Sequence, residues 1–157
     1  MELKNYIREI ENFPKEGIGY KDISPLLLDH EAMKEVIAKF VARLPDVRID
    51  KVVGMESRGF FFASLLAQEL KAGFVPVRKP GKLPAKKFKQ EYDLEYGSDS
   101  LEIHQDAIQV GENVLIHDDV LATGGTAQAT CNLVEICKGN IVQCNFLIEL
   151  DFLKGRD

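Results

Sequence analysis

Apolar residues along this chain recur with the spacings of helices and strands, and these spacings predict the order of its elements. Short apolar runs predict buried strands at residues 51–55, 74–78, 114–116 and 141–150. Apolar positions three or four residues apart predict helices over residues 3–10, 29–44, 60–70 and 127–138. Buried strands that alternate with helices are typical of a parallel, twisted sheet flanked by helices on both faces, so we expect an α/β fold.

Two segments depart from this alternation. Residues 12–28 contain two prolines and two glycines, so we expect an irregular segment that, with the helix before it, forms a small N-terminal hood over residues 1–28. Residues 92–96 and 101–104 alternate apolar and polar on either side of a Gly-Ser-Asp turn, which predicts a β-hairpin. A hairpin with so little apolar surface should be mobile, and we expect a flexible loop over residues 79–105. All of these segments fit one domain, residues 1–157.

Composition and charge narrow the class of protein. Of the 157 residues, 45% are hydrophobic and 29% are charged, and the net charge is −5. This negative charge argues against general nucleic-acid binding, which needs a positive field. The N-terminus has no signal-peptide core, no apolar run approaches transmembrane length, and three cysteines without CxxC spacing fit a reduced compartment. We therefore expect a soluble, cytoplasmic protein with neither a membrane nor a nucleic acid as partner.

Residues 114–130 carry the strongest chemical signal. The predicted strand is followed by Asp118 and Asp119, then by a turn of small residues, and then by helical spacing. The turn consists of Ala122, Thr123, Gly124, Gly125 and Thr126. Its N–H groups and the helix N-terminus favour phosphate, whereas the two carboxylates are suited to accept hydrogen bonds from neutral hydroxyls. The stretch therefore predicts a site for a phosphorylated ribose.

This motif is not one of the common nucleotide-binding loops. It has no Gly-Lys-Ser/Thr as in a P-loop, and no GxGxxG as in a dinucleotide fingerprint. An apolar strand followed by Asp-Asp and Thr-Gly-Gly-Thr resembles the phosphoribosyl pyrophosphate (PRPP) motif of the type I phosphoribosyltransferases. The resemblance implies that Asp118 and Asp119 hold the ribose 2- and 3-hydroxyls and that the loop holds the 5-phosphate.

Further strings extend the resemblance over nearly the whole chain. They are FPK at 13–15, DISPL at 22–26, ESRGF at 56–60, RKPGKLP at 78–84, LEYG at 94–97 and LEIH at 101–104. Together they are similar to the adenine phosphoribosyltransferases. The resemblance implies the type I phosphoribosyltransferase fold, a homodimer, and a reaction in which PRPP and adenine give AMP and pyrophosphate with Mg²⁺ as cofactor. Mg²⁺ would bind mainly through PRPP, pyrophosphate and water, so we expect no dedicated protein metal site.

Three cations are candidates for contact with pyrophosphate. The forked guanidinium of Arg58 suits a pair of pyrophosphate oxygens. Lys79 and Lys82 follow a predicted strand end, where the loops of an open α/β sheet meet their ligand.

The remaining roles depend on the resemblance. Glu95 matches the glutamate that handles the proton lost from the base, and Tyr96 follows it in the same loop. Tyr20, Lys21 and Val120 map to the base pocket. Tyr20 and Val120 stand where phenylalanine and leucine are commoner in these enzymes.

Three alternatives remain open at this stage. An oxopurine phosphoribosyltransferase would use hypoxanthine, guanine or xanthine. A non-catalytic, PRPP-sensing regulator would need a DNA-binding domain or a basic face, and the length and the negative charge argue against both. A generic sugar-phosphate binding protein is the third.

Overall fold

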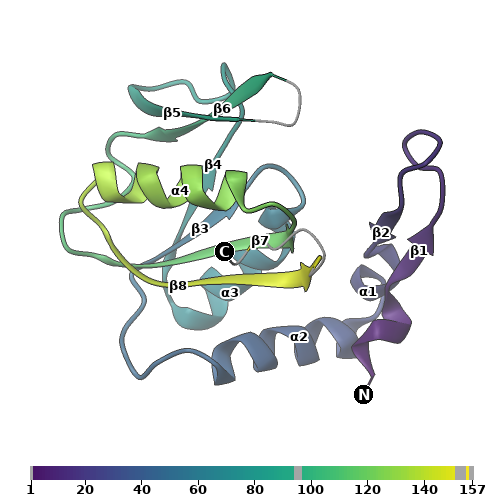
Figure 1. Ribbon diagram of the computed structural model, residues 1–157. Coiled ribbons are helices and arrows are strands. Elements are labelled where there is room, and N and C mark those ends of the chain that lie inside the picture. Colours follow the sequence, from purple (N-terminus) through teal and green to yellow (C-terminus); the bar gives the residue numbers. More distant parts are fainter. Residues whose placement is uncertain (1, 94–96, 151–154, 156–157) are drawn as a thin grey trace. The chain divides into compact units, whose positions relative to one another are not determined.

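The computed structural model describes residues 2–93, 97–150 and 155, and its contacts divide them into two compact units. The first unit is Met1–Arg43 and the second is Leu44–Asp157. Figure 1 shows the elements of each unit, which are described separately below. The expectation of a single domain with a hood over residues 1–28 stays a prediction.

The N-terminal unit begins differently from the predicted helix over residues 3–10. Only Leu3–Tyr6 is helical, as one 3₁₀ turn (η1), and Arg8–Ile10 is a strand, β1. β1 pairs antiparallel with β2, Tyr20–Asp22, which lies in the segment predicted to be irregular. The prediction was wrong here because a partner strand from the same segment outweighs a weak helical period. A short helix, α1, follows at Ser24–Leu27.

The second helix of this unit matches its prediction closely. α2 spans His30–Ala42, and the carboxylate of Asp29 caps it by accepting a hydrogen bond of 3.0 Å from the N–H of Ala32. Its buried residues are Ala32, Val36 and Phe40, spaced as on one helical face.

The second unit is built on the predicted parallel sheet. Its strands are β3 (Lys51–Met55), β4 (Gly73–Val77), β7 (Asn113–Leu121) and β8 (Asn140–Glu149), in the order β4-β3-β7-β8. All neighbours run parallel, and helices α3 (Gly59–Leu70) and α4 (Gly125–Ile136) pack against the sheet. Figure 1 shows them on opposite faces, which confirms the α/β prediction.

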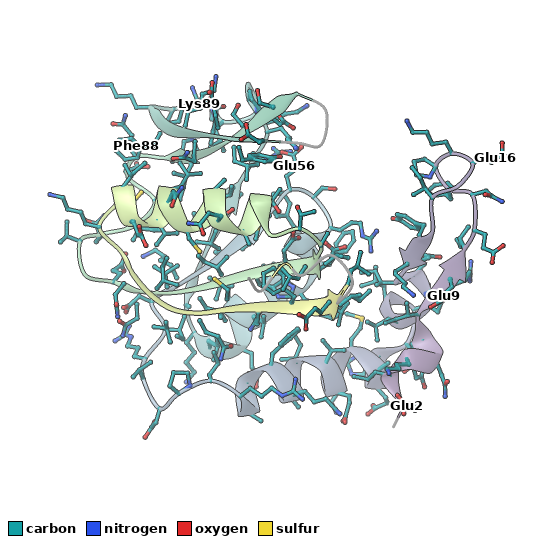
Figure 2. All side chains as sticks on the ribbon, in the orientation of Figure 1. Glu2, Glu9, Glu16, Glu56, Phe88 and Lys89 are labelled. Atoms are coloured by element: carbon teal, nitrogen blue, oxygen red, sulfur yellow. The ribbon has the colours of Figure 1, made fainter. Side chains whose placement is uncertain are left out.

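The hairpin has more apolar surface than the sequence suggested. Its strands are β5 (Lys87–Asp93) and β6 (Ser98–His104), so β5 begins before the predicted strand and β6 includes part of the predicted turn. Leu101 and Ile103 are fully part of the core, and Phe88 packs against that core, whereas the neighbouring Lys89 is exposed (Figure 2). The premise of little apolar surface was therefore wrong, while mobility itself stays a prediction.

Gly139, which follows helix α4, is required for close packing and not for a left-handed backbone. The left-handed residue after the helix is Lys138, with φ of 65°, rather than the glycine. A Cβ on Gly139 would lie 3.0 Å from side-chain carbons of Ile108 and Val134, so glycine is required for close packing.

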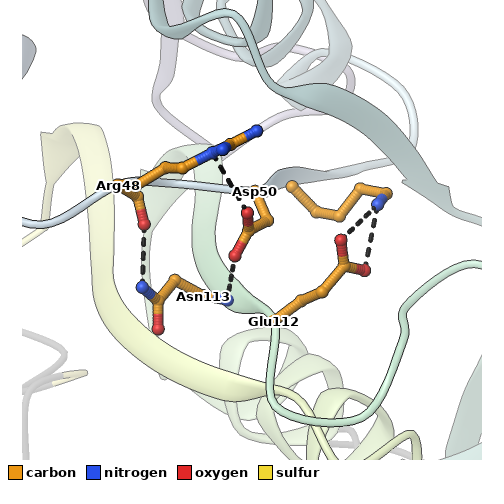
Figure 3. A network of polar contacts seen from close by, with 5 residues as sticks. Arg48, Asp50, Glu112 and Asn113 are labelled. Carbon is orange, nitrogen blue, oxygen red and sulfur yellow. Dashed lines mark hydrogen bonds and ion pairs between the residues drawn. The ribbon is translucent and has the colours of Figure 1, made fainter.

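A polar network ties β3 to β7 at their amino ends, away from the loops described below (Figure 3). The ammonium of Lys51 donates to both carboxylate oxygens of Glu112, at 2.9 and 2.8 Å. The carboxylate of Asp50 accepts from the backbone N–H of Asn113 at 2.8 Å. The hydrogen bond from Lys51, followed by one from the backbone of Gln109, holds the pKa of Glu112 below its ordinary value of 4.5.

We predict that Glu112→Gln lowers the free energy of unfolding by about 1 kcal/mol at pH 7, the upper range for a partly exposed ion pair. Because the folded pKa of Glu112 is depressed, the contribution is complete above the ordinary value of 4.5 and is lost as the pH falls through the folded pKa. Denaturant titrations at pH 7 and pH 3 should therefore show a difference from wild type that shrinks in acid. Glu135→Gln, which changes an exposed carboxylate on α4, is the matched control. Equal losses in both variants would contradict this role.

Candidate active site

Strand β7 is longer than predicted and carries the acidic pair within it. Asp118 and Val120 are paired in register with Phe146 and Ile148 of β8. The strand continues to Leu121, so the acids are held by a ladder of backbone hydrogen bonds and not by a loop. They stand at the carboxyl end of the sheet, where open α/β sheets bind ligands.

The two adjacent acids are stabilised by a nearby arginine. Asp119 is buried, and its Oδ2 lies 2.5 Å from the Nε of Arg58, the residue at the start of α3. The Oδ1 of Asp118 accepts from the N–H of Asp119 at 2.8 Å. Burial, and then the charge of Asp119, raise the pKa of Asp118 above its ordinary value. Hydroxyl groups that donate to this pair would relieve the repulsion between the acids.

Helix α3 approaches the acids so closely that its first residue must be glycine. A Cβ on Gly59 would lie 2.7 Å from Oδ1 of Asp118 and 3.4 Å from its Cα. The sequence ESRGF therefore places the guanidinium of Arg58 and the carboxylate of Asp118 around one helix start. Close approach, and not φ, explains this glycine.

The small-residue loop after β7 lines a pocket of about 640 Å³. The predicted loop residues, all of which line it, are Ala122, Thr123, Gly124, Gly125 and Thr126. Gly124 has φ of 92° and precedes α4, whose first-turn N–H groups form the kind of cradle that favours phosphate. Val120, predicted for the base pocket, lines the same pocket.

Five further pocket residues were not predicted from the sequence. They are Tyr92 and Asp93 of β5, Leu121 of β7, Ala127 of α4 and Phe146 of β8. Phe146 could have been found from strand register, since it pairs with Asp118. The two hairpin residues carried no signal, because the sequence did not show that β5 packs on α4 beside the loop.

The loop after β4, residues 78–86, is called the cationic loop here, and two carboxylates accept hydrogen bonds from it. Oε1 of Glu56 accepts from Nε of Arg78 and from the backbone N–H of Lys79, each at 3.0 Å. Glu102 of β6 is buried and accepts from the N–H of Gly81 at 3.0 Å. Figure 2 labels Glu56 beneath the hairpin.

These contacts also fix the charge of Glu56. Burial acts to raise its pKa, but the hydrogen bonds from Lys79 and Arg78 and the charges of Arg78 and Lys82 outweigh burial and hold the pKa below its ordinary value. Glu56 is therefore ionised at neutral pH and balances part of the positive charge of the loop. Lys82 itself is exposed, as a contact for a charged ligand requires.

Lys79 is held by the hairpin. Its ammonium donates to the hydroxyl of Tyr92 at 2.9 Å and to Oδ2 of Asp99 at 2.6 Å. Of the three cations predicted from the sequence, Lys79 therefore contacts a residue that lines the pocket.

The other residues predicted for the site are not among the described residues that line the pocket. Glu95 and Tyr96 lie outside the described residues, so their catalytic assignment stays a prediction. Tyr20 and Lys21 belong to β2 of the N-terminal unit, where the rings of Tyr20 and Phe13 meet edge to face at 4.9 Å and Lys21 pairs with Glu9. Their contact with a base also stays a prediction.

His117 is a structural residue within the described part of the site. It is fully buried behind the acids, and its Nδ1 lies 2.7 Å from Oδ1 of Asn145. Burial lowers the pKa of His117 to about 4, so the imidazole is neutral at physiological pH. A neutral ring hydrogen-bonded to an amide aligns β7 and β8 without adding charge beside the acids.

The acids are oxygen donors of the kind that Mg²⁺ prefers. Across residues 2–93, 97–150 and 155, no three His, Cys, Asp or Glu side chains gather as a metal site. If Mg²⁺ binds together with a phosphorylated substrate, Asp118 and Asp119 could contribute one or two of its oxygen ligands.

We predict that Gly59→Ala destabilises the protein by about 1–3 kcal/mol, as overpacking does, and weakens PRPP binding, because the new methyl and the Asp118 carboxylate cannot keep their places. Thermal unfolding and a calorimetric PRPP titration measure the two effects. Gly19→Ala is the control, since an added Cβ there meets no heavy atom within 4 Å and the backbone is not left-handed. Unchanged stability and unchanged PRPP affinity in Gly59→Ala would contradict the close approach.

Comparison with known proteins agrees with this geometry. A family model described as the phosphoribosyl transferase domain matches residues 26–151. An adenine phosphoribosyltransferase of Christiangramia forsetii is 69% identical over 157 residues, which cover 100% of this chain and 92% of that protein.

Solved structures give the same picture. Adenine phosphoribosyltransferase of Rhodothermus marinus superposes with a TM-score of 0.94 at 52% identity, covering 98% of this chain and 88% of that one. The Saccharomyces cerevisiae enzyme, complexed with a dideoxyimino-altritol bisphosphate and adenine, has a TM-score of 0.94 at 49% identity, with coverage of 98% and 90%. The chain therefore belongs to the phosphoribosyltransferase family and, within it, to the adenine phosphoribosyltransferases.

Proposed function

We propose that this protein is a purine salvage enzyme that transfers the phosphoribosyl group of PRPP to adenine, giving AMP and pyrophosphate. The observation that carries the proposal is one pocket that unites the Thr-Gly-Gly-Thr loop with the end of β7, the strand of the acidic pair. The similarity to adenine phosphoribosyltransferases over the whole chain supports the choice of adenine. Neither the oxopurine alternative nor the regulator gains support from these relatives.

In the proposed reaction, a ring nitrogen of adenine forms a bond to C1 of the ribose as the bond from C1 to pyrophosphate breaks. Asp118 and Asp119 accept hydrogen bonds from the ribose hydroxyls, and N–H groups of residues 122–126 bind the 5-phosphate. Arg58, Lys79 and Lys82 stabilise the charge that develops on the leaving pyrophosphate. Bound Mg²⁺ would supply further positive charge to the same oxygens.

Recognition of adenine is assigned to Val120 and, in the N-terminal unit, to Tyr20 and Lys21. Adenine presents an amino donor beside ring acceptors, whereas an oxopurine presents a carbonyl acceptor beside an N–H donor. Main-chain groups set for adenine would meet an oxopurine with acceptor against acceptor, and buried groups would be left unpaired.

We also propose a cytoplasmic homodimer, as the resemblance implies. Throughout the described residues, no helix combines the length and apolarity needed to cross a membrane.

The proposal is tested by AMP formation from PRPP, Mg²⁺ and a panel of bases. We expect turnover with adenine and discrimination of about 10⁴ in kcat/KM against hypoxanthine and guanine, the scale of a donor–acceptor mismatch. Tyr20→Ala should raise the KM for adenine through lost stacking. Comparable kcat/KM for adenine and hypoxanthine would refute the specificity and leave phosphoribosyl transfer standing. No AMP with adenine would refute the function.

Gly125→Val should abolish PRPP binding and leave the fold intact. The backbone at Gly125 is not left-handed, and an added Cβ would make ordinary contacts, 3.6 Å from Tyr92, so the branched side chain would occupy the pocket without a clash. Calorimetric titration with PRPP and circular dichroism measure binding and fold. Asp119→Asn should weaken binding less, because an amide oxygen still accepts a hydrogen bond. A folded Gly125→Val variant with wild-type affinity would remove this loop from the site.

Glu95→Gln should lower kcat by ~10²–10⁴, the usual effect of losing a general acid or base, with little change in PRPP affinity. The reason is that the amide cannot take up the proton that adenine loses. Single-turnover kinetics are the appropriate measurement, because slow product release would hide the chemical step. A wild-type rate of the chemical step would rule out Glu95 as the proton acceptor.

A further inference from the structure

Lys79 is held through its backbone and through its ammonium group. Its backbone N–H donates to Glu56 at 3.0 Å, and its ammonium donates to Tyr92 and Asp99 of the hairpin, at 2.9 and 2.6 Å. The ammonium also lies 5.6 Å from the centroid of the Tyr92 ring. A long lysine side chain without such contacts would sample many rotamers, so this half-buried one is unusually restrained.

The ring of Tyr92 also lies against the loop of residues 122–126. It lines the pocket of the phosphate-binding loop, and its Cδ2 lies 3.6 Å from the position of a Cβ on Gly125. One aromatic side chain therefore spans from the 5-phosphate loop to the cationic loop. A rigid ring of this kind fixes the separation between the two loops.

We propose that Tyr92 and Asp99 are positioning residues that aim the ammonium of Lys79 at the pyrophosphate group of PRPP. This inference rests on the proposed function. An ammonium has three donors, and Tyr92 and Asp99 use two of them. The hydrogen bonds to Tyr92 and Asp99 orient the ammonium so that its third N–H donates to a pyrophosphate oxygen. Tyr92 thereby sets the distance between the site for the 5-phosphate and the site for the pyrophosphate.

The charge state of Lys79 agrees with this role. Burial acts to lower its pKa, but the hydrogen bonds to Asp99 and Tyr92 outweigh burial and raise the pKa. The ammonium therefore remains charged throughout the neutral range and is available to an anion. The position of Lys79 after β4 leaves its charge on the side of the pocket that Tyr92 lines.

Replacing Asp99 distinguishes a positioning role from a purely electrostatic one, because the two roles predict opposite changes in PRPP affinity. If only net charge mattered, removal of an anionic group beside a pyrophosphate site would tighten PRPP binding. If Asp99 positions Lys79, the same removal weakens PRPP binding. If the contact merely fastens the hairpin, stability falls and PRPP affinity does not change.

The test is calorimetric titration of PRPP with Mg²⁺ into the full chain. The variants are Tyr92→Phe, which keeps the ring, Asp99→Asn, which keeps an acceptor, Lys79→Met, and the two double variants. We expect Tyr92→Phe and Asp99→Asn each to weaken PRPP binding about two- to tenfold, the range for one hydrogen bond. Added to Lys79→Met, neither should cause further loss. Glu91→Gln, which removes an exposed hairpin carboxylate, is the charge control and should bind as wild type does.

Steady-state kinetics supply the second readout. The KM for PRPP should rise in both single variants, while the KM for adenine stays at the wild-type value. Unchanged or tighter PRPP binding in Asp99→Asn, or equal losses with and without Lys79, would overturn the inference. If Asp99→Asn fails to fold, Tyr92→Phe decides alone. A wild-type protein that binds PRPP but forms no AMP would refute the proposed function, and the titrations would still decide the role of Tyr92 and Asp99.

Discussion

The burial of two neighbouring acids, Asp118 and Asp119, is the constraint on which the rest of the site depends. They stand at the end of a strand with parallel partners on both sides, where burial raises the pKa of Asp118. Arg58 offsets the charge of Asp119 at 2.5 Å, and Gly59 lets α3 come near enough for that contact. The loop of residues 122–126 lies beyond the end of β7, and in the proposed reaction its N–H groups bind phosphate while the acids accept hydrogen bonds from neutral hydroxyls.

The same balance of charge recurs in the cationic loop. Arg78 and Lys79 contact Glu56, the loop backbone contacts Glu102, and the ammonium of Lys79 contacts Asp99. These carboxylates hold the cations in place and leave further donors for a ligand. Groups held in place before binding lose less conformational entropy when the ligand arrives, which is the physical value of this arrangement.

Much of this structure could be predicted from the sequence, because its strongest signals are local. The order of elements from α2 onward and the pocket loop follow from period, caps and glycine pattern. The prediction of a helix over residues 3–10 was wrong because β1 pairs with a strand ten or more residues later in the chain. The local spacing of apolar residues gives no information about such a contact. Tyr92 and Asp93 were missed for a related reason, since they reach the pocket through packing of the hairpin on α4.

The central claim is that the two acids near the end of β7 bind the ribose hydroxyls and that the adjoining loop, residues 122–126, binds the 5-phosphate. A crystal structure of the protein with PRPP and Mg²⁺, without adenine, tests it most directly. We expect the 5-phosphate to accept hydrogen bonds from N–H groups of residues 122–126, and both ribose hydroxyls to donate to Asp118 and Asp119. A phosphate bound elsewhere, with hydroxyls that do not contact either acid, would contradict the account.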